Sequence, residues 1–385
     1  MKTLPFLFVF AIAVVSADFL DHSKLDDLFQ KNKLDEFVNG LKGISERTRD
    51  TLRKAGSLRK KMTEQGSKSV DKEVFNEFFN FIVKFEKIYD NETHIEHHFG
   101  KFKDSLSRIE DLQKKMPLTK FGVTMFADLT PEEFIQKHTG VKAAEDVQKL
   151  RSRVSKTLRP KRSVYPTSWD WRDHNGVTSV KNQAQCGSCY AFAAVAAIES
   201  HFKIANNWDL DLSEQSAISC TYNVSAYRYN QGCNGGWSDT VIQYASDYGL
   251  PTEQQYPYVS GKDAQVSYCQ ALPVAVKPNY VFTIPPNNEE NMALAIYTWK
   301  PMVSYIDASP LQYYQGGVLD AAEPASGWVI NHAVLTVGYG EENGVPYWII
   351  KNSWGPAWGE AGFVRIRRGT NCLDISHYNY GVNNN

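Results

Sequence analysis

One short segment, residues 183–192, constrains this chain more than any other stretch. It reads Gln-Ala-Gln-Cys-Gly-Ser-Cys-Tyr-Ala-Phe, a Gly/Ser turn that runs into an alanine-rich apolar segment. Val195, Ile198 and Phe202 among the following alanines predict a buried helix that begins at Cys189. A thiol at a helix start lies beside free backbone N–H groups and the positive end of the helix dipole, and both favour the thiolate. Cys189 is therefore a candidate nucleophile.

Two other roles are open for the cysteines of this segment. In a secreted protein, Cys186 and Cys189 can be structural cysteines only. Cys-x-x-Cys also occurs in thioredoxin-like redox proteins, but nothing in this chain reads as the βαβ pattern that such a motif needs.

The N-terminus indicates entry into the secretory pathway. Lys2 precedes an apolar run over residues 4–15, and Val-Ser-Ala follows, so residues 1–17 are predicted to be a signal peptide. Asn91 and Asn223 begin glycosylation tripeptides that suit this route. No internal stretch is apolar enough for a membrane span, and a net charge of -1 gives no reason to expect nucleic acid or an anionic membrane as a partner. We expect a lysosome-like compartment or the extracellular space as the destination.

The region before residue 163 has its own organisation. Residues 18–70 form a helix-prone N-terminal extension with one or two amphipathic helices, which pack on a neighbour or, alternatively, bind a partner. Residues 74–115 carry a second helical pattern with an aromatic face, and residues 121–130 alternate like a strand. Thr130, Pro131 and Glu133 then mark the start of a helix.

A boundary follows at residues 141–162, which are basic and end in Arg-Pro-Lys-Arg. This stretch is either a processing site or an ordinary basic linker. After it, the nucleophile segment and further short helices precede strand patterns over residues 334–339, 347–351 and 363–367. A helical first half and a β second half predict an α+β domain of two packed lobes with a cleft between them.

A cysteine nucleophile needs a base and a third group that orients the base. His332 comes where an apolar strand begins, and Asn352 follows a neighbouring strand. His201 lies on the helix after Cys189, too far along it to fold back onto the thiol.

Together, Gln-x-x-Cys-Gly-Ser-Cys, His332 and the later Asn-Ser-Trp-Gly resemble the papain family of cysteine proteases. The resemblance covers residues 163–385 and implies a papain-like two-lobed fold, with a helical left lobe and a β-barrel-like right lobe. Gly122, Thr124, Phe126 and Asp128 resemble a motif of the family's helical inhibitory propeptide, which we assign to residues 71–162.

The resemblance also implies the roles of the site residues. Cys189 is the nucleophile that forms a thioester acyl-enzyme, His332 is its base, and Asn352 orients the imidazole. Gln183 and the Cys189 N–H form the oxyanion hole, and a thiolate–imidazolium pair exists before substrate arrives. The residues implied to bind substrate are Gly235, Gly236, Trp237, Ile306, Ala333, Trp354 and His377. Of these, Trp237, Ile306 and Ala333 are implied to line the main specificity pocket, which takes the second side chain before the cut, and His377 is expected near its base, where it would favour an acidic or polar side chain at low pH.

The family pattern pairs Cys186 with Cys233 and Cys220 with Cys269, which leaves Cys372 as a free or intermolecular thiol. Tyr190 replaces a common tryptophan, as in cathepsin C-like aminodipeptidases, but the short extension favours an open cleft and endopeptidase activity. The implied partners are peptide or protein substrates, the chain's own propeptide and cystatin-type inhibitors, with no metal or cofactor. One rival interpretation is a non-catalytic binding protein on the same scaffold. A second treats residues 18–128 as a free-standing protease inhibitor that is released by cleavage.

Overall fold

The computed structural model describes residues 22–30, 33–66, 69–141, 156–160 and 164–383. The predicted signal peptide and most of the basic linker lie outside these residues. The chain forms two compact units, one of residues 1–107 with 127–129 and one of residues 108–126 with 130–385. The domain boundaries proposed from the sequence remain predictions.

The first unit is helical. Its helices are α1 (His22–Gln30), α2 (Leu34–Gly40), α3 (Glu46–Glu64), α4 (Ser69–Lys84) and the first part of α5 (Glu92–Lys115). The described residues of the predicted extension thus contain three helices rather than one or two, and the pattern over residues 74–115 is two helices. The chain leaves α4 at Glu86, whose φ is 47°, and α5 begins after Asn91, whose side chain accepts from the His94 N–H at 2.9 Å. A left-handed residue and a new N-cap therefore divide a continuous apolar pattern.

An aromatic core holds this unit together, as the sequence pattern predicted. The ring of Phe78 lies within 6.0 Å, centroid to centroid, of the rings of five other residues. They are Phe75, Phe81, Tyr89, Phe99 and Phe102. Offset and edge-on ring pairs of this kind add to the free energy gained by burying the rings.

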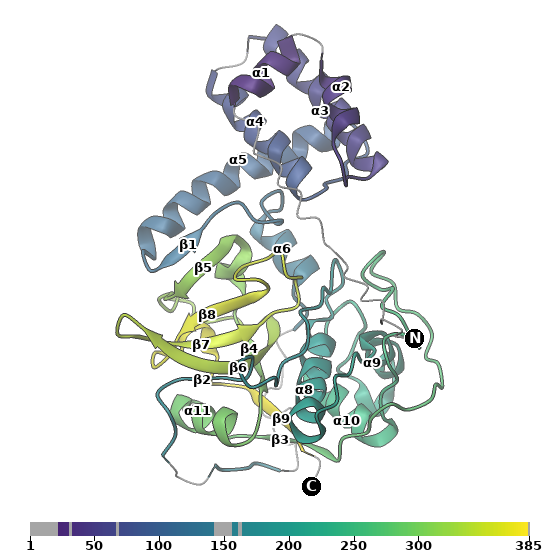
Figure 1. Cartoon of the computed structure of the whole chain (residues 1–385), viewed down its shortest axis with the longest axis vertical. Coiled ribbons are helices and arrows are strands. Elements are labelled where there is room, and N and C mark those ends of the chain that lie inside the picture. Colours follow the sequence, from purple (N-terminus) through teal and green to yellow (C-terminus); the bar gives the residue numbers. More distant parts are fainter. Residues whose placement is uncertain (1–21, 31–32, 67–68, 142–155, 161–163, 384–385) are drawn as a thin grey trace, which may run out of the picture. The chain divides into compact units, whose positions relative to one another are not determined.

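The second unit is built on one sheet, shown with its helices in Figure 1. Its strands run in the order β1-β5-β8-β7-β6-β4-β9-β3, with β2 on β6, and all pairs are antiparallel except β5 with β8. The strands are β1 (Thr119–Phe121), β2 (Trp169–Asp170), β3 (Tyr280–Thr283), β4 (Met302–Ile306), β5 (Tyr314–Leu319), β6 (His332–Glu342), β7 (Val345–Lys351), β8 (Phe363–Arg367) and β9 (Asn379–Asn383).

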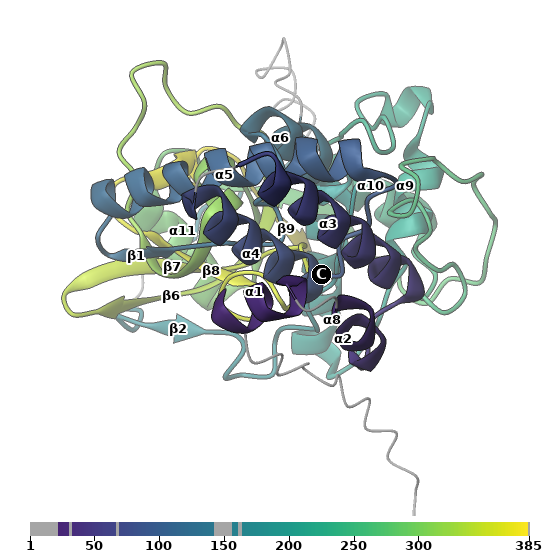
Figure 2. The ribbon, with the colours of Figure 1, turned by 90° about the horizontal axis from the view of Figure 1, so that it is seen from above.

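This unit also contains helices, which are α6 (Pro131–His138), α8 (Cys189–Asn206), α9 (Glu214–Thr221), α10 (Ser238–Tyr248) and α11 (Glu289–Thr298). Helices α8, α9 and α10 pack on one another, whereas α11 packs on β6. In both Figure 1 and Figure 2, α9 and α10 lie on one side and strands β6 to β8 on the other. The helical and β-rich parts predicted from the sequence are thus both present.

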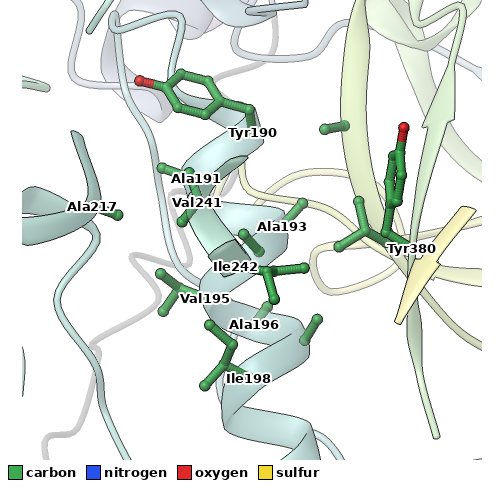
Figure 3. Packing of buried hydrophobic residues seen from close by; sticks show 14 of the residues in the cluster. Tyr190, Ala191, Ala193, Val195, Ala196, Ile198, Ala217, Val241, Ile242 and Tyr380 are labelled. Carbon is green, nitrogen blue, oxygen red and sulfur yellow. The ribbon is translucent and has the colours of Figure 1, made fainter. Parts of the chain in front are cut away.

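Helix α8 is the shared core of the two parts (Figure 3). It begins at Cys189, as predicted, and its residues through Lys203 are all buried. Small alanines at 191, 193 and 196 allow close packing, with Val241 of α10 and Tyr380 of β9 in the same cluster. A helix buried on all sides suits its nearly uniform apolar sequence.

The strand predicted over residues 121–130 is wrong beyond Phe121. The Thr124 hydroxyl donates to the Gln312 carbonyl and also accepts from the Phe126 N–H at 3.2 Å, a local turn that replaces a strand ladder. The predicted helix start at Thr130 is confirmed, with a capping box in which Thr130 and Glu133 bond each other's backbone N–H.

Candidate active site

Cys189 lies at the junction of the helical and β-rich parts of the second unit. It is the first residue of α8, and its sulfur accepts from the Ala333 N–H of β6 at 3.4 Å. The thiol is fully buried and belongs to no disulfide. The prediction that Cys189 begins a helix is therefore confirmed, and strand β6 of the β-rich part supplies a further N–H to its sulfur.

His332 and Asn352 come together as the sequence analysis expected. His332 is the first residue of β6, and its Nε2 lies 2.8 Å from Oδ1 of Asn352, just beyond β7. The Asn352 oxygen also accepts from the Ser353 N–H, so Nε2 carries the proton and Nδ1 is free to act as a base. Among the described residues, Nδ1 has no hydrogen-bond partner. Trp354 stacks on the imidazole at 4.8 Å and keeps water from this pair.

Burial shifts both ionisable groups toward their neutral forms. It raises the pKa of the Cys189 thiol from 9.0 to about 12, although backbone N–H groups oppose the shift. It lowers the pKa of His332 from 6.5 to about 4, against a smaller opposing effect of the Asn352 hydrogen bond. In this covered site the thiol and the neutral imidazole are favoured, whereas the sequence analysis expected an ion pair before substrate arrives.

Gln183 belongs to the same short segment as Cys189, and both the oxygen and the nitrogen of its side-chain amide are hydrogen-bonded. Its Oε1 accepts from the Ser353 hydroxyl at 2.6 Å, which fixes which way the amide points. Its Nε2 donates to the carbonyl of Cys186 at 3.0 Å and to that of His138 at 3.2 Å. Nε2 of Gln183 is the donor expected in the oxyanion hole, and it therefore already donates to two carbonyl oxygens.

The His138 carbonyl belongs to residues 138–141, a segment that lies over the site and that we call the cover. The His138 carbonyl also accepts from the Trp354 indole at 2.8 Å. The N–H groups of Gly140 and Val141 donate to the Asn331 carbonyl at 3.1 and 2.9 Å, and the Gly140 carbonyl accepts from the Gly236 N–H at 2.8 Å. The cover thus occupies backbone groups on both sides of the site.

Gly235 and Gly236, two of the residues predicted to bind substrate, form a glycine wall that makes one of these contacts. Gly235 has a φ of 108°, a conformation that glycine adopts readily, and it turns the chain so that the Gly236 N–H reaches the cover. A Cβ on Gly236 would lie 2.7 Å from the ring of Tyr190. Tyr190 is buried beneath it and donates its hydroxyl to the Gly232 carbonyl at 3.0 Å.

The other predicted substrate-binding residues fall into two groups. Trp237 and Ala333 belong to one buried cluster, together with Tyr305 of β4. Ile306, the next residue of β4, pairs in register with His332 and is absent from that cluster in the described part of the chain. His377 is half-buried, lies 2.8 Å from Asp374 and stacks on Tyr378 at 4.4 Å.

The structure contains two disulfides, Cys186–Cys233 and Cys220–Cys269. The first joins the nucleophile segment to the glycine wall. Cys372 is free and buried, and its sulfur lies 3.7 Å from the Leu319 carbonyl, so it is sealed inside the unit.

A buried ion network supports the residue before Asn352. The Lys351 amine donates to the Thr178 hydroxyl at 3.0 Å, and Thr178 donates to Glu199 of α8 at 2.6 Å. Lys181 bridges Glu199 and Glu214 of α9 at 2.8 and 2.9 Å. This network ties β7 to the two helices and so holds Asn352 relative to Cys189.

Three features of the site were not predicted from the sequence: Ser353 as the residue that orients Gln183, Tyr305 in the buried cluster of Trp237 and Ala333, and the cover at residues 138–141. Only the serine has a sequence signal, since it lies within Asn-Ser-Trp-Gly. In the ranges that the structure describes, no three His, Cys, Asp or Glu side chains are grouped to hold a metal ion. The described helices include none that is long and apolar enough to cross a membrane.

Two family models match the chain. The model of papain family cysteine proteases matches residues 165–382, and that of the cathepsin propeptide inhibitor domain matches residues 78–134. Cysteine proteinase 1 of Dictyostelium discoideum is 36% identical over 327 residues, which are 81% of this chain and 93% of that protein. The viral cathepsin of Heliothis zea nuclear polyhedrosis virus is 35% identical over 313 residues, 77% of this chain and 82% of the viral protein.

Solved structures of proenzymes are also similar. Digestive procathepsin L 3 from the larval midgut of Tenebrio molitor superposes with a TM-score of 0.70 at 32% identity, covering 82% of this chain and 100% of the other. A recombinant stem bromelain precursor superposes with a TM-score of 0.67 at 32% identity, covering 80% of this chain and 98% of the other.

Proposed function

The chain belongs to the papain family of cysteine proteases as a zymogen with an inhibitory propeptide, and from this we propose that it is an endopeptidase with Cys189 as nucleophile and His332 as base. The observation that carries the proposal is the meeting of three distant segments at one place. Nε2 of His332 is bonded to Asn352, the Cys189 sulfur accepts from the N–H of Ala333, the residue after His332, and the Gln183 amide is bonded to Ser353, the residue after Asn352.

In the proposed reaction, Nδ1 of His332 takes the Cys189 proton and the thiolate attacks the peptide carbonyl carbon. The carbonyl oxygen becomes an oxyanion that accepts from the Gln183 amide and the Cys189 N–H. His332 then returns the proton to the leaving amine as the C–N bond breaks, which leaves a thioester. Water, deprotonated by the same imidazole, hydrolyses the thioester and regenerates the thiol. Asn352 holds the imidazole in the required tautomer throughout.

We further propose that the ion pair forms only when the cover leaves. Burial is the main cause of both pKa shifts. When the cleft opens, water reaches both side chains, and their pKa values return toward those that favour the ion pair. The cover also blocks the Gln183 donor and the Gly236 N–H, so no substrate carbonyl or backbone competes for them.

Two disulfides suit an oxidising compartment, so we propose that the chain follows the secretory pathway to a lysosome-like compartment or the exterior. Protein substrates are the proposed targets, and cystatin-type inhibitors are proposed partners of the uncovered cleft.

The test is to express the proprotein, shift it from pH 7 to about pH 4.5 and follow its size and the hydrolysis of fluorogenic peptides with blocked and free N-termini. We expect processing to a smaller form that cleaves blocked peptides under reducing conditions, with no activity in Cys189→Ala. A processed wild type that cleaves nothing would favour the binding-protein alternative. Cleavage of free N-termini alone would indicate an aminodipeptidase.

A further inference from the structure

Three buried aromatic side chains pack together around Trp237, a residue predicted to line the specificity pocket, and this inference rests on the function proposed above. The rings of Trp237 and Tyr305 stack at 4.8 Å, and Tyr378 lies 5.8 Å from the first and 6.2 Å from the second. The Tyr305 hydroxyl accepts from the Ser238 N–H at 2.7 Å, and this bond prevents the ring from swinging away. We call these three residues the aromatic wall.

The register of the sheet brings the wall to the nucleophile. Tyr305 of β4 is the direct partner of Ala333 of β6, so the two side chains lie on the same face of the sheet. The Ala333 N–H donates to the Cys189 sulfur, which puts Tyr305 one strand away from the thiol. Ile306 pairs with His332 and points to the opposite face, because successive residues of a strand alternate.

Backbone hydrogen bonds hold Val141 of the cover next to residues that flank the wall. Its N–H donates to the Asn331 carbonyl, and the preceding residue accepts from the Gly236 N–H, next to Trp237. The Val141 side chain is buried, with 6% of its surface exposed, in the cluster that also contains all three rings and Ala333. The chain therefore covers its own cleft with a short, β-branched side chain.

We propose that Tyr305 makes this pocket shallow, so that the enzyme selects substrates with valine or isoleucine as the second residue before the cut and disfavours phenylalanine. A tyrosine whose ring is stacked and whose hydroxyl is bonded cannot give way to a larger side chain without breaking those contacts. His377 stacks behind Tyr378 and is bonded to Asp374, so it does not extend the pocket or select an acidic residue.

The first test uses the activated enzyme and four blocked fluorogenic dipeptides that share arginine before the cut and carry valine, isoleucine, phenylalanine or glutamate as the second residue. We expect kcat/KM for valine and isoleucine to exceed that for phenylalanine by about tenfold or more. Tyr305→Ala should raise the phenylalanine-to-valine ratio by a similar factor, whereas Tyr305→Phe keeps the ring and should leave the ratio within about twofold.

Three results would overturn the proposal: phenylalanine cleaved as well as valine by wild type, a ratio that Tyr305→Ala does not change, or glutamate preferred below pH 6. If no peptide is cleaved by any variant, the proposed function fails, and the pocket is judged by a second test that needs no turnover.

The second test enlarges the side chain at position 141 of the cover and shortens the side chain at position 305 of the wall in the full-length proenzyme. The readout is the rate at which iodoacetamide alkylates Cys189 at pH 7, followed by peptide mass mapping. Val141→Phe should not fit and should raise the rate about tenfold or more, whereas Val141→Ile should leave it near that of wild type. Adding Tyr305→Ala to Val141→Phe should return the rate to within about threefold of wild type. A Val141→Phe rate equal to wild type, or a double variant no slower than the single one, would refute the shallow pocket.

Discussion

Replacing Gly140 by alanine should uncover the active site. A Cβ at this position would lie 2.1 Å from the carbonyl oxygen of Gly187, far closer than atoms of the two residues can approach. The atom that it meets is backbone, and Gly187 is held by the bond from its N–H to the Cys233 carbonyl at 3.0 Å. The cover must therefore move, because the nucleophile segment cannot.

The size of the effect follows from the contacts that hold the cover. Overpacking a fitted site costs about 1–3 kcal/mol, and the three backbone hydrogen bonds at Gly140 and Val141 contribute about 0.5–1.5 kcal/mol each. A shift of about 1–3 kcal/mol toward the open form corresponds to roughly 5–150-fold in its population.

The assay is the alkylation of Cys189 by iodoacetamide in the full-length proenzyme at pH 7, with peptide mapping to separate it from Cys372. The alkylation rate of Cys189 in Gly140→Ala should exceed that of wild type by roughly 5–150-fold. Processing of this variant to the smaller form at about pH 4.5 should also start earlier than in wild type. Gly100→Ala is the matched control, since a Cβ on Gly100 of α5 meets nothing within 4 Å. Equal alkylation rates for wild type and Gly140→Ala would refute the seating of the cover against Gly187.

Three further predictions concern the site and its support. Gln183→Ala should lower kcat about 10²–10³-fold with little change in KM, measured on the processed enzyme, and an unchanged kcat would exclude its amide from the oxyanion hole. In a Cys189→Ala background, the neutral His332 binds fewer protons in the folded than in the unfolded chain, since its pKa is about 4 rather than 6.5. The contribution of His332 to the free energy of unfolding is therefore complete above about pH 6.5 and falls by roughly 3 kcal/mol as the pH drops to about 4. His332→Gln should make Tm fall less over this pH range, and curves of Tm against pH that run parallel for the two variants would contradict the assignment. Thr130→Ala removes the oxygen that accepts from the Glu133 N–H and should lower the free energy of unfolding by about 0.5–2 kcal/mol in urea denaturation, whereas Thr130→Ser should retain most of it.

Local features of this protein could be read from its sequence because their causes lie within a few residues. The helix that begins at Cys189, the cap at Thr130 and the strand that begins at His332 all follow from periodicity and from turn or cap residues. The pairing of His332 with Asn352 was also expected, but from the family resemblance and not from geometry. The strand predicted after Phe121 failed, because a threonine hydroxyl captures the backbone N–H that a strand would have used.

Tertiary structure alone decided what shapes and covers the site. Which residue of β4 faces the thiol depends on its register with β6, and a shift of one residue exchanges Tyr305 for Ile306. The seating of residues 138–141 depends on Asn331, Gly236 and Gly187, which are distant in sequence. The shift of the Cys189 and His332 pKa values toward the neutral forms has burial as its main cause, and burial exists only in the folded chain. Periodicity and motifs report only on neighbours along the chain, whereas register, covering and desolvation arise from contacts that exist only once the chain has folded.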